Sequence, residues 1–337
     1  MSFPESAAAF MAKQSERLRR ASKRIKIVFP EGDDARVIEA AAHLAHDGLL
    51  DPVLIGRAPA QAPAGVQFID PAQSQLAQKY AALLYERRRA KGVTQIEAAE
   101  TARGRLHFAA LMVTAGDADG FVGGAVHTTA DSVRAVLQSM DLKPGFRRIS
   151  SVHLLAVQDR SYGRDGLLAF SDAAIIAVPS AVELAEIAIA SADTARALFD
   201  AEPLVALLSF STKGSAKHKE VDKVTSALKY IRERAPQLNV DGELQADAAL
   251  VPSVGKSKSP GSPVAGAANV LIFPDLNSAN IGYKLVERLG NAALLAVLLQ
   301  GTVKPVGIIS RGCTAEDAVN TAILTAIQAE SARAAAV

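Results

Sequence analysis

Short apolar segments recur along the chain, and each ends in a turn that is followed by an alanine-rich helical pattern. Residues 25–29 form the first such segment and residues 306–309 form the last. Apolar runs bounded by turn residues predict buried strands, and the apolar periodicity between them predicts helices. This alternation favours an α/β fold with largely parallel sheets. Ligands of such folds bind where the strands end, so the turns after strands are the places to seek functional residues.

Length and composition limit the classes of protein to which this chain can belong. The 337 residues predict about two domains, and the Pro-Gly tract at 141–146 is a candidate boundary. Lys and Arg number 37 against 35 Asp and Glu, a balance that argues against a dedicated nucleic-acid binder. The one cysteine, Cys313, excludes an intramolecular disulfide and suits a reducing cytoplasm. The apolar runs, such as 292–299, are shorter than the ~20 residues that a membrane span needs.

Familiar signatures of nucleotide and metal sites are absent from the sequence. The glycine spacing at 261–266 resembles a P-loop, but Ala267 and Ala268 follow where Lys and Ser or Thr are required. No G-x-G-x-x-G follows the first predicted strand. His43 and His46 are three residues apart without a second ligand pair, so a structural role is favoured over a metal site.

Two segments that follow predicted strands carry groups suited to anions. In residues 123–131, two glycines precede Thr128 and Thr129 at a predicted helix start, where backbone N–H groups attract phosphate. An ordinary capped helix start is the alternative. Residues 209–217 hold four hydroxyl side chains and two lysines, which suits a phosphate or ribose contact. The alternative there is a polar loop.

Two further segments carry candidate chemistry near the C-terminus. Residues 274–284 place Asn277 and Asn280 on one face of a helix, although capping by Asp275 or Asn277 also explains the pattern. In residues 310–317, Arg311 is a fork donor for a phosphate or an oxyanion. Asp317 stands one turn into the next helix.

The alternative for this last segment is concrete, because Thr314 and Asp317 have the spacing of a capping box. Cys313, close to a helix start, is either a nucleophile with a lowered thiol pKa or, more simply, a small packing residue.

Taken together, several blocks in order resemble the family of phosphate acetyltransferases (phosphotransacetylases) and phosphate butyryltransferases. The resemblance extends from about residue 23 to about residue 329. The matching blocks are Val28–Gly32, Gly124–Asp131, Leu208–Ser215, Asp241–Ala249, Phe273–Lys284 and Ser310–Cys313.

The resemblance implies a fold of two α/β domains with largely parallel sheets and an active-site cleft between them, as in isocitrate and isopropylmalate dehydrogenases. The implied first domain is discontinuous and comprises residues 1–145 with 301–337. Residues 146–300 form the second. The resemblance also implies a cytoplasmic homodimer that acts on small molecules, with no nucleic-acid or membrane partner.

The implied reaction is acetyl-CoA + phosphate ⇌ acetyl phosphate + CoA, by direct attack of the CoA thiolate in a ternary complex. Asp317 would be the general base, Arg311 would stabilise the developing negative charge, and Ser310 would hydrogen-bond the thiol or the tetrahedral intermediate. CoA is a substrate here, and neither a cofactor nor a metal is implied. The residues expected to bind substrate are Arg88, Thr128, Thr129, Arg134, Ser211, Thr212, Lys213, Asn277, Asn280 and Lys284. The register of the phosphate-binding arginine is open between Arg87, Arg88 and Arg89.

Other functions remain as alternatives. The same fold occurs as a non-catalytic sensing module for acetyl-CoA or acetyl phosphate, which predicts erosion of Ser310, Arg311 and Asp317, yet all three are present. A phosphate acyltransferase for a longer acyl chain differs only in its acyl pocket. A covalent acetyl-Cys313 route and a nucleotide-dependent dehydrogenase are less favoured, the latter because no cofactor fingerprint is found.

Overall fold

The computed structural model describes residues 4–334 and divides into two compact units. The N-terminal unit comprises Ala12–Lys143 and Thr302–Val337, and the central unit comprises Met1–Met11 and Pro144–Gly301. Residues 4–11 therefore group with the central unit, whereas the sequence placed them in the first domain. That first junction falls within helix α1 (Glu5–Arg20). The outermost positions of the expected first domain, 1–3 and 335–337, lie outside the described residues.

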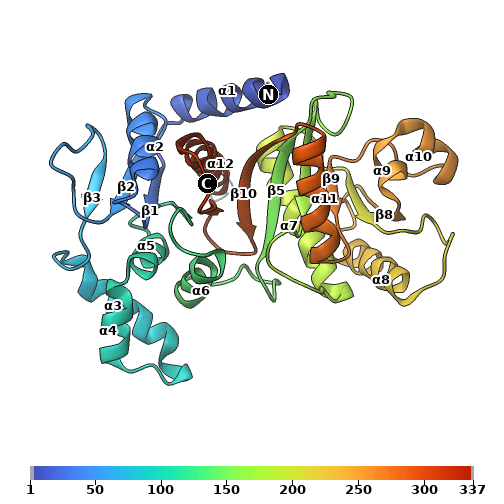
Figure 1. The fold of residues 1–337 in the computed structure, drawn as a ribbon. Helices are drawn as coiled ribbons and strands as arrows, with labels where there is room; N and C mark the ends of the chain where they lie inside the picture. The colour runs from blue at the N-terminus through green and yellow to red at the C-terminus, as the bar shows by residue number, and fades with distance from the viewer. Residues whose placement is uncertain (1–3, 335–337) are drawn as a thin grey trace. The chain divides into compact units, whose positions relative to one another are not determined.

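The N-terminal unit is built on five parallel strands in the order β3-β2-β1-β4-β11. Helices α2 and α12 pack against each other. Helix α12 also contacts β1, β4 and β11, and α2 contacts β2, while α5 and α6 form another packed pair (Figure 1). The strands are β1 (Lys26–Phe29), β2 (Asp51–Ile55), β3 (Gln67–Ile69), β4 (Gly120–Gly123) and β11 (Val306–Ile308). The helices are α2 (Ala35–His46), α3 (Leu76–Arg88), the 3₁₀ turn η1 (Arg89–Lys91), α4 (Gln95–Arg103), α5 (Arg105–Thr114), α6 (Thr129–Ser139) and α12 (Ala315–Ala334).

The central unit has six strands in the order β10-β5-β6-β9-β7-β8. The pairs β10–β5 and β5–β6 are antiparallel, and the remaining pairs are parallel. The strands are β5 (Ser150–Ala156), β6 (Leu167–Ser171), β7 (Val205–Leu208), β8 (Val240–Leu244), β9 (Val270–Ile272) and β10 (Ala293–Gln300). The helices are α7 (Ala181–Phe199), α8 (Lys219–Arg234), α9 (Ala246–Leu250), α10 (Pro252–Lys258) and α11 (Leu276–Leu289). The prediction of an α/β fold with largely parallel sheets is confirmed.

Burial explains why these segments become strands. Every residue of β5 and β6 is buried, and so is every residue of β7, β8 and β9. Strands covered on both faces read as continuous apolar runs rather than as alternating patterns. Within residues 4–334, no helix is both long and apolar enough to cross a membrane.

Candidate active site

In the N-terminal unit, the turns after β1, β4 and β11 lie side by side, because neighbouring parallel strands end at the same edge of a sheet. The N–H of Ile309, after β11, donates to the carbonyl of Gly123 at 2.9 Å. At Gly124, φ is +122°, and a Cβ there would stand 2.0 Å from the carbonyl oxygen of Ile309. Only glycine permits this approach, and it brings the segment that begins at Gly124 against the segment that begins at Ser310.

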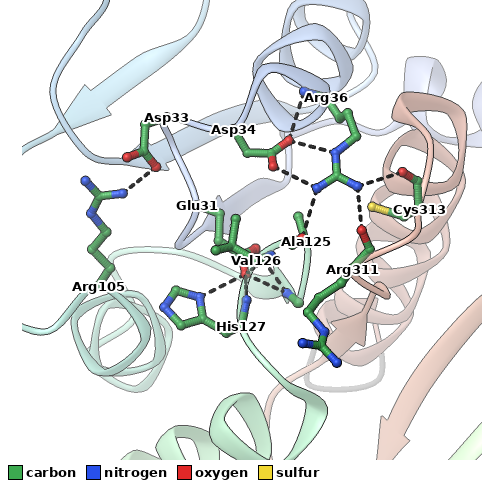
Figure 2. A network of polar contacts seen from close by, with 11 residues as sticks. Glu31, Asp33, Asp34, Arg36, Arg105, Ala125, Val126, His127, Arg311 and Cys313 are labelled. Atoms are coloured by element: carbon green, nitrogen blue, oxygen red, sulfur yellow. Dashed lines mark hydrogen bonds and ion pairs between the residues drawn. The ribbon is translucent and has the colours of Figure 1, made fainter.

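The three predicted catalytic residues lie on the segment that joins β11 to α12. Ser310 and Arg311 are exposed, and the side chain of Arg311 points away from Arg36 (Figure 2). Asp317 is exposed in the first turn of α12. One of its carboxylate oxygens accepts the N–H of Thr314 at 2.8 Å, and its own N–H donates to the Thr314 hydroxyl at 3.1 Å. The capping box that the sequence raised as an alternative is therefore present, and it leaves one carboxylate oxygen of Asp317 without a hydrogen bond among residues 4–334.

Cys313 behaves as a packing residue rather than as a nucleophile. Its side chain is buried, and burial raises the pKa of the thiol, with the nearby Arg36 acting in the opposite direction. A raised pKa lowers the thiolate fraction at neutral pH.

Two charged residues of the turn after β1 join the three segments, and neither was assigned a role from the sequence (Figure 2). Glu31 is 1% exposed and accepts hydrogen bonds from the N–H groups of Gly124, Val126 and His127, at 3.0–3.2 Å. It also contacts Nδ1 of His127 at 3.0 Å. Arg36, in the first turn of α2, donates to the carbonyl oxygens of Ala125, Arg311 and Cys313 at 2.8–2.9 Å. The sequence signal for Glu31 was its place directly after a strand.

The threonines predicted to bind anions lie at the start of α6. Thr128 is the N-cap, and its hydroxyl accepts the N–H of Asp131 at 3.1 Å and donates to the Asp131 carboxylate at 2.7 Å. Thr129 is exposed at the first helical position. Arg134 donates to the same carboxylate at 2.8 Å. The capped helix start that the sequence offered as an alternative is therefore present. The Asp131 carboxylate accepts hydrogen bonds from the side chains of both Thr128 and Arg134.

The three consecutive arginines have different surroundings. Arg87 donates to Asp141 at 2.9 Å, and Arg89 lies 3.1 Å from Glu86. Arg88, the last residue of α3, has neither a hydrogen bond nor an ion pair from its side chain within the described part of the chain. Its positive charge and that of Arg134 both act with burial to lower the pKa of His107.

In the central unit, three predicted substrate-binding residues have hydrogen-bond or ion-pair partners on or just after β8. The hydroxyl of Ser211 donates to Glu243 at 2.8 Å, and that of Thr212 accepts the N–H of Gln245 at 2.9 Å. Lys213 forms an ion pair with Asp241 and donates to the Gly242 carbonyl at 3.0 Å. These contacts order the loop that follows β7. The residues involved are Ser211, Thr212, Lys213, Asp241, Gly242, Glu243 and Gln245.

The start of α11 carries the remaining predicted contacts. Asp275 is the N-cap and accepts the N–H of Ser278 at 2.9 Å, so the capping alternative is present here too. Asn277 is exposed, and Asn280 donates to the Ala173 carbonyl at 3.2 Å. Lys284 is exposed, with its ammonium group 5.2 Å from the centre of the Tyr283 ring.

No group of three or more His, Cys, Asp or Glu residues that could hold a metal ion occurs in the stretch from residue 4 to residue 334. The only described cysteine is Cys313.

Comparisons with known proteins cover almost the whole chain. The profile of the phosphate acetyl/butaryl transferase family matches residues 9–326. The phosphate acetyltransferase of Thermoanaerobacterium thermosaccharolyticum is 46% identical over 316 residues, which is 92% of this chain and 96% of that protein. The phosphate acetyltransferase of Bacillus subtilis is 45% identical over 318 residues, again 92% and 96% of the two chains.

Solved structures agree with these sequence comparisons. A phosphotransacetylase from Streptococcus pyogenes superimposes with a TM-score of 0.89 at 42% identity, over 98% of this chain and 99% of that one. A branched-chain phosphotransacylase from Enterococcus faecalis shares the fold, with a TM-score of 0.67 at 17% identity over 90% of this chain and 99% of that one. The chain therefore belongs to the phosphate acetyl/butaryl transferase family.

Proposed function

We propose that this protein is a phosphate acetyltransferase that interconverts acetyl-CoA plus phosphate with acetyl phosphate plus CoA. The observation that carries the proposal is the segment from Ser310 to Asp317, which follows β11 and exposes the side chains of Ser310, Arg311 and Asp317, in a chain that matches phosphate acetyltransferases over nine-tenths of its length. A serine, an arginine and a carboxylate on one segment supply the groups that acyl transfer to a thiol requires.

The chemistry divides between these three side chains. A free thiol has a pKa of ~8.5, so only a few per cent of CoA is thiolate at neutral pH. Asp317 takes the thiol proton, and the sulfur forms a bond to the carbonyl carbon of acetyl phosphate. Arg311 stabilises the negative charge that develops on the carbonyl oxygen. Ser310 hydrogen-bonds the sulfur or the intermediate. The carbon–oxygen bond to phosphate then breaks, and phosphate leaves.

Arg88 and Arg134 are the proposed anion contacts of the N-terminal unit, together with Thr128 and Thr129. Helices α3 and α6 contact each other, and both arginines act electrostatically on His107, which supports this assignment because positive charge attracts an anion. In the central unit, the exposed Asn277 and Lys284 are proposed contacts for CoA. Ser211, Thr212, Lys213 and Asn280 are also proposed to contact substrate, and like Thr128 and Arg134 each has a protein partner that orients it.

The proposal includes a homodimer in the cytoplasm, with small molecules as the substrates and no further cofactor. Three apolar side chains spaced four residues apart on α11 support the dimer. Ile281, Leu285 and Leu289 are 59%, 52% and 79% exposed. A stripe of this kind on one helix face is typical of a protein–protein contact. The mass in solution, measured by light scattering, tests it.

The decisive experiment follows the thioester absorbance as the purified protein converts acetyl phosphate and CoA into acetyl-CoA, with butyryl phosphate as a parallel substrate. We expect turnover by the wild type and a loss of ~10²-fold or more in Arg311→Ala, the size expected when one oxyanion donor is removed. A folded wild type that binds CoA without turnover would favour the sensing module. A preference for butyryl phosphate would favour the longer-chain alternative.

Arg88→Ala is expected to raise the KM for acetyl phosphate or CoA by ~10-fold or more, because a charge-assisted hydrogen bond contributes about 1.5–3 kcal/mol. Arg87→Ala and Arg89→Ala are matched controls on the same helix end. Their partners are Asp141 and Glu86, so both KM values should stay within about threefold of wild type. A larger KM effect in either control would move the anion contact to that position.

A further inference from the structure

The turn between β1 and the start of α2 holds a pair of opposite charges that the proposed reaction does not use. Glu31 and Arg36 are five residues apart, and Asp34, the N-cap of α2, lies between them. Arg36 reaches the segment that carries the proposed catalytic groups, and Glu31 reaches the neighbouring segment that follows β4 (Figure 2). Any role for them in acyl transfer rests on the proposed function.

Arg36 has no donor left for a substrate. Its Nε–H donates to one oxygen of Asp34 at 3.0 Å, and Nη2 donates to the other at 2.8 Å. The second hydrogen of Nη2 serves the Ala125 carbonyl at 2.9 Å. Nη1 serves the carbonyls of Arg311 at 2.8 Å and Cys313 at 2.9 Å. A guanidinium group has five N–H donors, and all five are engaged.

Glu31 binds the segment after β4 as a hydrogen-bond acceptor, whereas Arg36 binds it as a donor. Its buried carboxylate takes only N–H donors, from Gly124, Val126 and His127. Apart from its two bonds to Asp34, Arg36 donates to carbonyl oxygens, among them that of Ala125, which lies between Gly124 and Val126. The segment after β4 is thus hydrogen-bonded through its N–H groups to Glu31 and through a carbonyl group to Arg36. Of these two residues, only Arg36 forms hydrogen bonds to the segment after β11.

We propose that Arg36 is a positioning residue for acyl transfer. It fixes the backbone of Arg311 through that residue's own carbonyl oxygen, against a segment that Glu31 immobilises. The Arg311 side chain points away from Arg36, so a fixed backbone at Arg311 restricts the positions that its guanidinium group can take. Catalytic groups must be held within a fraction of an ångström of their working geometry, and a shift of 1 Å lowers a rate by ~10²-fold.

The test compares Arg36→Ala with the wild type in the acetyl-CoA assay, with kcat and both KM values measured. We expect kcat to fall by ~10²-fold while the KM values for CoA and acetyl phosphate stay within about threefold, since Arg36 touches neither. Guanidinium ion at tens of millimolar is expected to restore kcat at least ~10-fold, because it has the donor geometry that was removed. Arg105→Ala is the matched control, because it breaks the ion pair with Asp33 on the same turn and should retain wild-type kcat.

Arg36→Lys covers the case in which the alanine variant does not fold. Lysine keeps the charge beside Asp34 but has three donors from one point, so kcat should still fall at least ~10-fold with unchanged KM values. A kcat within threefold of wild type would overturn the proposal, as would a raised KM with normal kcat. So would a loss of kcat that only tracks lost thermal stability and resists guanidinium. An inactive wild type would instead refute the proposed function.

Discussion

Replacing Asp317 with asparagine is expected to lower kcat by ~10²-fold or more while α12 keeps its cap. The side-chain oxygen of asparagine can still accept the N–H of Thr314, which Asp317 accepts at 2.8 Å, but an amide cannot take a proton from the thiol. General-base catalysis by a positioned carboxylate contributes ~10²–10⁴-fold. The acetyl-CoA assay measures the loss, and the thermal midpoint reports on the cap.

Two controls separate the cap from the base. Asp317→Ala removes both, so it should lose at least as much activity as the asparagine variant and, in addition, about 1 kcal/mol of stability. Thr314→Ala removes the hydroxyl that accepts the Asp317 N–H and leaves the carboxylate in place, so kcat should stay within a few-fold of wild type. If asparagine supports near-normal turnover, Asp317 is a helix cap only and the base lies elsewhere.

The fold was largely predictable from local patterns, but strands β3, β8 and β10 were not predicted. The segments at 25–29 and 306–309 match β1 and β11 to within a residue, because each is an apolar run that ends in a turn. Strand β10 was not recognised, since residues 292–299 are uniformly apolar and have no period that separates strand from helix. Its antiparallel pairing with β5 depends on residues about 140 positions away, which no local pattern encodes.

Of the candidate site, the sequence indicated only exposed residues. Ser310 and Arg311 lie just after β11, and Asp317 lies in the first turn of the helix that follows, where functional residues are expected. Arg36 falls within an ordinary amphipathic helix, and its partners Arg311 and Cys313 lie 275 and 277 residues further along the chain. The converse holds at Lys213, a cation for which the sequence shows no partner and which forms an ion pair with Asp241. Sequence shows which side chains are available, whereas the partners that occupy them are set by tertiary contacts.

Acidification is expected to destabilise the central unit through His153 on β5. The side chain is 3% exposed, its ring centre lies 4.6 Å from that of Tyr283, and its Nδ1 is buried without a hydrogen-bond partner among residues 4–334. Burial, aided by the positive charge of Lys284, lowers the pKa of His153 from 6.5 to about 3. The folded protein therefore holds this ring neutral where the unfolded chain would protonate it.

The direction of the pH dependence follows from which state of the protein, folded or unfolded, binds a proton at His153. Above pH 6.5 the ring is neutral in both states and contributes no pH dependence. As the pH falls below 6.5, only the unfolded state binds the proton, so the free energy of unfolding drops by about 1.4 kcal/mol per pH unit until the folded pKa is reached. Near pH 5 this amounts to about 2 kcal/mol, and the full effect approaches about 5 kcal/mol.

His153→Phe is expected to remove this dependence, because phenylalanine fills a similar space beside Tyr283 and does not titrate. Its unfolding midpoint in urea should match or exceed that of wild type near pH 7.5, since the unpartnered buried nitrogen is gone. Between pH 7.5 and pH 5 it should lose about 2 kcal/mol less stability than the wild type does. His153→Leu checks that the result does not depend on how the larger ring packs. Equal losses in wild type and both variants would mean that the folded protein accommodates a charged His153, and that acid destabilisation comes from other groups.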